Sequence, residues 1–131
     1  MNRFKPALLA VTLGASVASA AAADFDGSKP LICAAIEAND CALGVPCING
    51  PAEDISVPQF IRLNFAEKTI SARGRTSGIQ NFSRREGMLV IQGFENSRAW
   101  SVTIGEESGK LVGAVAGDEE GFLIFGACTP L

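Results

Sequence analysis

The chain has 131 residues, of which 47% are hydrophobic and 19% are charged, a composition typical of one folded domain and not of a disordered protein. Histidine is absent and the net charge is −3, so the usual general base, the commonest metal ligand and the basic surface of most nucleic-acid binders are all missing. We therefore expect no enzyme activity, no cofactor or metal, and no nucleic-acid partner.

Residues 1–23 have the pattern of a secretory signal peptide. Two basic residues precede an apolar stretch, and a run of alanines ends at Ala23. We expect cleavage after Ala23, which leaves residues 24–131 with a net charge of −5. The first cysteine, Cys33, lies too far downstream to carry a lipid anchor, and no other segment is long enough to span a membrane. The sequence therefore predicts a periplasmic or secreted protein.

Four cysteines follow this segment, and an even number in a small exported domain indicates two disulfides. They are Cys33, Cys41, Cys47 and Cys128. Three pairings are possible, and the sequence does not choose between them. We prefer Cys41–Cys47, which closes a short turn-rich loop, together with Cys33–Cys128, which joins the first structured segment to the last. The spacing does not match that of zinc knuckles, so no metal site is expected.

Short apolar runs alternate with polar turns over residues 59–128, as in antiparallel strands joined by tight connections. The expected strands are 59–65, 68–72, 78–83, 88–94, 99–104, 110–116 and 121–128. The stretch 73–77 is expected to be a longer loop. Residues 30–38 suit either a helix or a strand, and as a strand they would pair with 121–128. Gly93 and Gly113 suggest bulges or sharp coiling within their strands.

Connections this short join only antiparallel neighbours, so the chain is predicted to be an all-β meander of seven or eight strands. Each strand has one apolar face, and the sheet must curl or fold over to cover it. We expect residues 24–131 to form a single small antiparallel barrel, closed or nearly closed, with two disulfides. A β-sandwich is the alternative.

Positive charge is concentrated in residues 62–98, where seven basic residues accompany three acidic ones. Six of the seven are arginine, which suits the bidentate recognition of carboxylate or phosphate. The candidate binding residues are Arg73, Arg75, Arg84 and Arg85, all expected on turns, and Trp100, the only tryptophan. Alternatively, these arginines pair with acids. Because successive turns alternate between barrel ends, the two arginine pairs would be separated, with the second pair beside the acidic turn 105–109.

The paired carboxylates Glu106-Glu107 and Glu119-Glu120 lie in expected turns. Solvent at a turn does not provide the burial that tunes a catalytic acid. A secreted hydrolase that uses carboxylates is therefore the least favoured function.

Several stretches carry a resemblance to known proteins: LICA at 31–34, PQFIR at 58–62, AWSVTI at 99–104, SGKL at 108–111 and FGACT at 125–129. With these, the chain resembles an uncharacterised family of small exported cysteine-containing β-proteins of proteobacteria. The resemblance implies export and a disulfide-linked β-fold, and it brings no activity or site residues. In size and fold the chain is also similar to the periplasmic c-type lysozyme inhibitors, which are small disulfide-linked β-barrels, but it matches no inhibitor loop motif.

Together these features predict an exported, non-catalytic binding protein. The expected partner is an envelope or extracellular protein, held through exposed loops as by an inhibitor module. The alternative is a carrier of a small apolar or anionic ligand. An apolar cavity lined by Trp100 and phenylalanines would favour the carrier, and a filled core would favour the protein binder. Any partner that contacts residues 62–98 should bind more weakly as salt rises.

Overall fold

The computed structural model describes residues 24–131, so the expected signal peptide lies outside the described residues. All regular elements in this part of the chain are β-strands. They are β1 (Leu31–Ala42), β2 (Ile48–Pro51), β3 (Phe60–Asn64), β4 (Thr69–Ala72), β5 (Arg75–Gly78), β6 (Asn81–Arg85), β7 (Met88–Glu95), β8 (Arg98–Gly105), β9 (Lys110–Ala116) and β10 (Glu120–Pro130). A search of residues 24–131 finds no helix that could cross a membrane.

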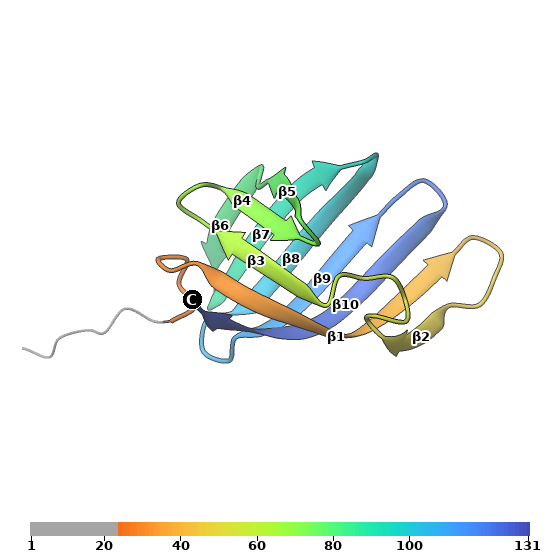
Figure 1. The fold of residues 1–131 in the computed structure, drawn as a ribbon, viewed down its shortest axis with the longest axis horizontal. Helices are drawn as coiled ribbons and strands as arrows, with labels where there is room; N and C mark the ends of the chain where they lie inside the picture. Colours follow the sequence, from red (N-terminus) through yellow and green to blue (C-terminus); the bar gives the residue numbers. More distant parts are fainter. Residues whose placement is uncertain (1–23) are drawn as a thin grey trace, which may run out of the picture.

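The strands form one antiparallel sheet in the order β5-β4-β3-β1-β10-β9-β8-β7-β6, and β2 pairs with β1 on the same side as β3. The sheet curls so that β3–β5 face β7–β9 across a shared interior (Figure 1). The edge strands β5 and β6 are linked by the chain itself. Ile79 N donates a hydrogen bond to Lys68 O at 2.8 Å, and Gln80 N donates to Gln92 O at 2.9 Å. The predicted antiparallel barrel is confirmed as a half-barrel made from a single sheet.

The first and last strands pair along their whole length, from Leu31 opposite Pro130 to Ala42 opposite Glu120. The Cys33–Cys128 disulfide joins directly opposite residues of this pair, with 3.9 Å between their Cα atoms. The Cys41–Cys47 disulfide closes the β1–β2 hairpin. Both preferred cysteine pairings are therefore confirmed.

Three local expectations need correction or extension. The ambiguous segment 30–38 is a strand, and it continues to Ala42 as β1. The expected loop 73–77 is instead a two-residue turn, Arg73-Gly74 at φ 49° and 73°, followed by β5. β2 was not expected at all. Both missed strands are short and polar, so neither has the apolar alternation by which a strand is recognised in a sequence.

The interior is filled at one end of the half-barrel and hollow at the other. The base is the end that holds the turns 65–68, 86–87 and 106–109, and the mouth is the end that holds the turns 73–74, 96–97 and 117–119. Large aliphatic side chains fill the base, and they are completely or almost completely buried: Leu31, Leu63, Leu89, Ile91 and Ile104. Within residues 24–131, the half-barrel is therefore filled with side chains at the base and open at the mouth.

The segment before β1 helps to close the base. Phe25 packs against the core, and its ring lies so close to Gly109 that a Cβ there would be 2.5 Å from Cζ. Only glycine fits at position 109, which has a positive φ of 65° as well. Elsewhere in the structure, the rings of Phe65 and Phe82 pack beside each other with centroids 5.0 Å apart.

Removal of the two disulfides is expected to have unequal effects on stability. Cys33–Cys128 spans 95 positions and Cys41–Cys47 spans 6. The chain-entropy model gives about 4–5 kcal/mol for the first and about 2–2.5 kcal/mol for the second. Urea unfolding of Cys33→Ala/Cys128→Ala should therefore show a larger loss of unfolding free energy than Cys41→Ala/Cys47→Ala. Equal losses would contradict the importance that we give to the β1–β10 joint.

Candidate functional site

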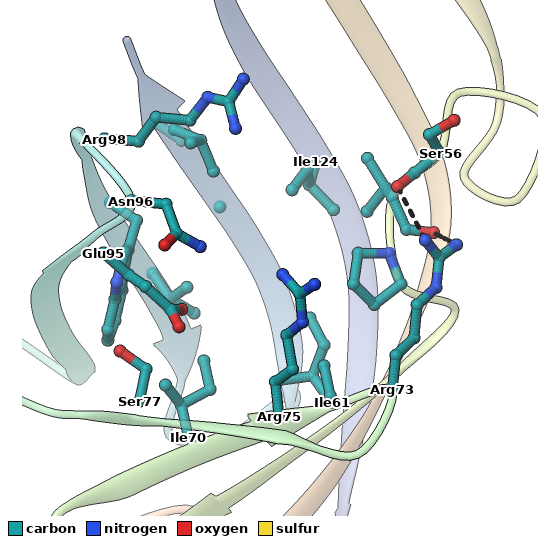
Figure 2. Close-up of a pocket in the computed structure, with 18 residues that line it drawn as sticks. Ser56, Ile61, Ile70, Arg73, Arg75, Ser77, Glu95, Asn96, Arg98 and Ile124 are labelled. Atoms are coloured by element: carbon teal, nitrogen blue, oxygen red, sulfur yellow. Dashed lines mark hydrogen bonds between the residues drawn. The ribbon is translucent and has the colours of Figure 1, made fainter.

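A cavity of about 600 Å³ opens at the mouth, between the two facing halves of the curled sheet (Figure 2). Its wall is mainly apolar and includes Pro58, Ile61, Ile70, Trp100, Val115 and Ile124. The lining contains the tryptophan that the carrier hypothesis requires, but no phenylalanine. The structure thus combines a filled core at the base with an apolar cavity above it.

On two strands, glycine follows large inward side chains toward the mouth. On β7 the inward positions run from Leu89 and Ile91 to Gly93, and on β9 they run from Leu111 to Gly113. A side chain on Gly113 would enter the space between β8 and β10 that now belongs to the cavity. Gly113 therefore leaves part of the upper half of the barrel open, whereas the space over Gly93 is occupied by the indole of Trp100.

Of the two expectations for these glycines, bulges or sharp coiling, the first is wrong. The register is continuous where Gly93 faces Trp100 and where Gly113 faces Val102. The register shift lies on β1 instead, at Ile36. The glycine at this point is on the partner strand: Gly126 of β10 lies opposite Ala35, and a Cβ there would collide with the backbone of Ala34.

Arg73 attaches one wall of the cavity to the sheet. Its guanidinium donates to the backbone oxygens of Ser56 and Val57, each at 3.2 Å (Figure 2). The same loop is held from within, since Val57 N donates to Ala52 O at 2.9 Å and Ile55 is buried. Arg73 thus fixes the loop between β2 and β3 as part of the mouth.

Arg98 and Glu95 bring further charge to the mouth from β8 and β7. The guanidinium of Arg98 forms an ion pair with the carboxylate of Glu120. Glu95 is the only acidic residue among those that line the cavity within residues 24–131, and three arginines line it. The lining therefore has an excess of positive charge.

Arg75 points into the cavity and has no acidic partner. It is the first residue of β5, and its side chain extends inward beside Ile61 (Figure 2). Within residues 24–131 the ion pairs are those of Lys29, Arg84 and Arg98, and no side-chain hydrogen bond of Arg75 is formed. Its guanidinium is therefore available to an anion that enters the mouth.

The structure divides the five predicted binding residues into two groups. Arg73, Arg75 and Trp100 meet at the mouth, whereas Arg84 and Arg85 lie at the base. This separation follows the predicted alternation of turns. The expectation that all four arginines lie on turns is wrong, because Arg75 belongs to β5 and the two basal arginines belong to β6.

Arg84 is already neutralised by the acidic turn that follows β8. Its guanidinium donates to both carboxylate oxygens of Glu106, at 2.6 and 3.0 Å. This hydrogen bonding lowers the pKa of Glu106 below its usual value and raises that of Arg84. The alternative hypothesis of arginines paired with acids therefore describes Arg84 and Arg98, but not Arg75.

Sequence reasoning missed Glu95, Arg98 and the wall formed by Ser56–Pro58. The expected strands 88–94 and 99–104 leave Glu95 and Arg98 in the turn between them. Strand periodicity could have placed both side chains on the inward face. Arg98 shares an inward face with Trp100, and Glu95 continues the inward positions of β7. The loop Ser56–Pro58 had no such signal, because its place depends on contacts with distant strands.

Comparison of the chain with protein-family models, with curated proteins and with solved structures finds no match in any of the three. The two resemblances drawn from the sequence therefore stay predictions. In the part of the chain that the structure describes, no group of three or more His, Cys, Asp or Glu side chains is arranged to hold a metal ion. The site must be interpreted from its own geometry.

The Arg84–Glu106 pair should make stability depend on acid pH. The pKa of Glu106 is lowered in the folded state, so its contribution is present above the unfolded pKa of about 4.3 and is lost as the pH falls through the folded pKa. Glu106→Gln should therefore unfold with a weaker dependence on pH below about 4.5 than the wild type, as followed by urea unfolding. Glu107→Gln, at an exposed neighbour outside the pair, is the control, and an identical pH profile for both variants would contradict this role.

Proposed function

We propose that this protein is an exported, non-catalytic binding protein that holds a small molecule with an apolar body and an anionic group in the mouth of the half-barrel. The observation that carries the proposal is Arg75, a guanidinium without an acidic partner in the described chain that points into a mainly apolar cavity. Of the two binding classes that the sequence suggested, this geometry favours the carrier.

Charge and apolar contact would act together at this site. Arg75 is exposed at the open rim of the cavity, so its guanidinium can form charge-assisted hydrogen bonds with an anion that arrives from solvent. The cavity volume of about 600 Å³ lies within the usual range of roughly 300–1,000 Å³ for small-molecule sites. The apolar wall would hold the body of the ligand, and Arg75 would orient its charged end.

Two further features support binding without catalysis in an exported compartment. The chain has no histidine, and one carboxylate, Glu95, lines the cavity within residues 24–131, so a carboxylate pair for hydrolysis is not formed by its lining. The disulfides Cys33–Cys128 and Cys41–Cys47 are compatible with an oxidising compartment. Both features agree with a carrier that acts outside the cytoplasm.

Arg75→Gln should weaken the binding of an anionic apolar probe by about tenfold or more, because a hydrogen bond to a charged group is worth about 1.5–3 kcal/mol. Anilinonaphthalene sulfonate is a suitable probe, and the rise in its fluorescence on binding gives the affinity.

The matched control is Arg62→Gln, since Arg62 is an exposed arginine between the inward residues of β3. It should bind the probe as the wild type does. Equal affinity of the wild type and Arg75→Gln would refute the proposed site.

A second candidate function is protein binding through the β1–β2 hairpin. This hairpin projects from the sheet (Figure 1), and its apolar side chains are strongly exposed: Leu43 by 85%, Val45 by 62% and Ile48 by 66%. The Cys41–Cys47 disulfide holds the loop in place. Residues 31–61 contain four acidic residues and no basic one, so the complementary partner is a protein with a basic surface around an apolar pocket.

Leu43→Ser/Val45→Ser should weaken binding to such a basic envelope protein by at least tenfold, since both side chains would be buried in its pocket. The measurement is the affinity of the purified partner at low and high salt. Leu131→Ser, at another exposed apolar residue, is the control. A partner whose affinity is unchanged by the hairpin substitutions and by salt would exclude this surface.

A further inference from the structure

We infer that the mouth selects planar aromatic monoanions, whose ring stacks on Trp100 while the anionic group meets Arg75. This inference rests on the proposed function and specifies its ligand class. An acyl chain could also fill an apolar cavity. The orientation of Trp100 and the distribution of charge around the rim favour a planar ring with one charge instead.

The indole of Trp100 lies flat against the sheet, over Gly93. A Cβ placed on Gly93 would be closer than 3.0 Å to Cζ2 and to both of its ring neighbours, Cε2 and Cη2. An atom beyond the edge of the ring would be near one of these atoms and distinctly farther from the other two. The glycine therefore lies under one face of the indole, and the other face is turned toward the barrel interior.

That free face belongs to the cavity wall. Trp100 lines the cavity, and on the sheet it has Gly93 of β7 on one side and Val115 of β9 on the other. The indole also packs against the core cluster below it, which holds the ring in place. A fixed aromatic face is a preorganised surface for a planar ring, because stacking there requires little further ordering of the protein.

The wall across the cavity is supplied by the other half of the sheet. Ile61 and Ile70 come from β3 and β4, and Pro58 precedes β3. These side chains add aliphatic surface to the cavity from the half of the sheet that faces β8. Arg75 lies on the same half as Ile61 and Ile70, beside this space (Figure 2).

The rim favours a single negative charge. Arg73 is engaged by backbone oxygens and Arg98 by Glu120, which leaves Arg75 for one anionic group. Glu95 lines the same mouth and would repel a second anionic group. A carboxylate fits the planar guanidinium in a bidentate manner, so an aromatic monocarboxylate satisfies each of these groups.

The test compares two monocarboxylates of similar carbon content, 2-naphthoate and decanoate, by isothermal titration calorimetry of the described chain. The wild type should bind 2-naphthoate about three- to tenfold more tightly, as expected for one stacked aromatic pair. Trp100→Leu should remove this preference and leave the affinity for decanoate within about twofold. Phe94→Leu, at an aromatic residue that is 55% exposed outside the cavity lining, should keep the preference.

Gly93→Ala provides a second variant in case Trp100→Leu folds poorly, because its new Cβ must displace the indole from the wall. It retains the tryptophan and should still lose the preference. The inference would be overturned if the wild type bound both acids with equal affinity, or if the preference for 2-naphthoate survived both substitutions. In either case, binding of decanoate to the wild type would leave the proposed function intact. A wild-type protein that binds neither acid would overturn both.

Discussion

The antiparallel pairing of the first strand with the last is the constraint on which the rest of the structure depends. β1 and β10 lie at the centre of the sheet order, so every other strand extends the sheet from one of them. This pairing brings together residues about a hundred positions apart, and the Cys33–Cys128 disulfide makes it permanent. With β1 and β10 as the fold line, β3–β5 extend from one side and β6–β9 from the other (Figure 1). The two halves can then curl over a common interior.

The cavity is a consequence of how that interior is filled. A curled sheet buries one face of every strand, and a well-packed interior would need a large side chain at each inward position. Leu89, Ile91 and Leu111 meet this need near the base, whereas Gly93 and Gly113 do not meet it near the mouth. Two clusters of buried residues stabilise the interior: a larger one at the base, and a smaller one formed by β1, the loop 52–57 and Ile124. The cavity lies beside the second cluster. Trp100 covers Gly93 and becomes part of the cavity wall.

Much of this fold could be predicted from the sequence, because alternation and turn residues are local signals. The strands 88–94, 99–104, 110–116 and 121–128 agree with β7–β10 to within a few residues, and both disulfides were preferred correctly. The short strands β2 and β5 were missed because polar edge strands need no apolar face. The site was harder to predict from the sequence. Arg75 and Trp100 were candidates, but the inward direction of the Arg75 side chain depends on which way the sheet curls. That direction is a property of the whole sheet, and no single segment specifies it.

The charge of the mouth is best understood against that of the whole molecule. Residues 24–131 have a net charge of −5, yet three arginines and one glutamate line the cavity. At 0.1–0.15 M salt, exposed charges are screened over roughly 8–10 Å, so a small anion is repelled only weakly by the distant acids and meets the local field of the mouth. A large polyanion, in contrast, would contact the acidic hairpin and the acidic turn 117–119 at the same time as the arginines. On the proposed function, the surface that surrounds the cavity would disfavour highly charged ligands, and Arg75 and the apolar wall would hold one that is small, apolar and singly charged.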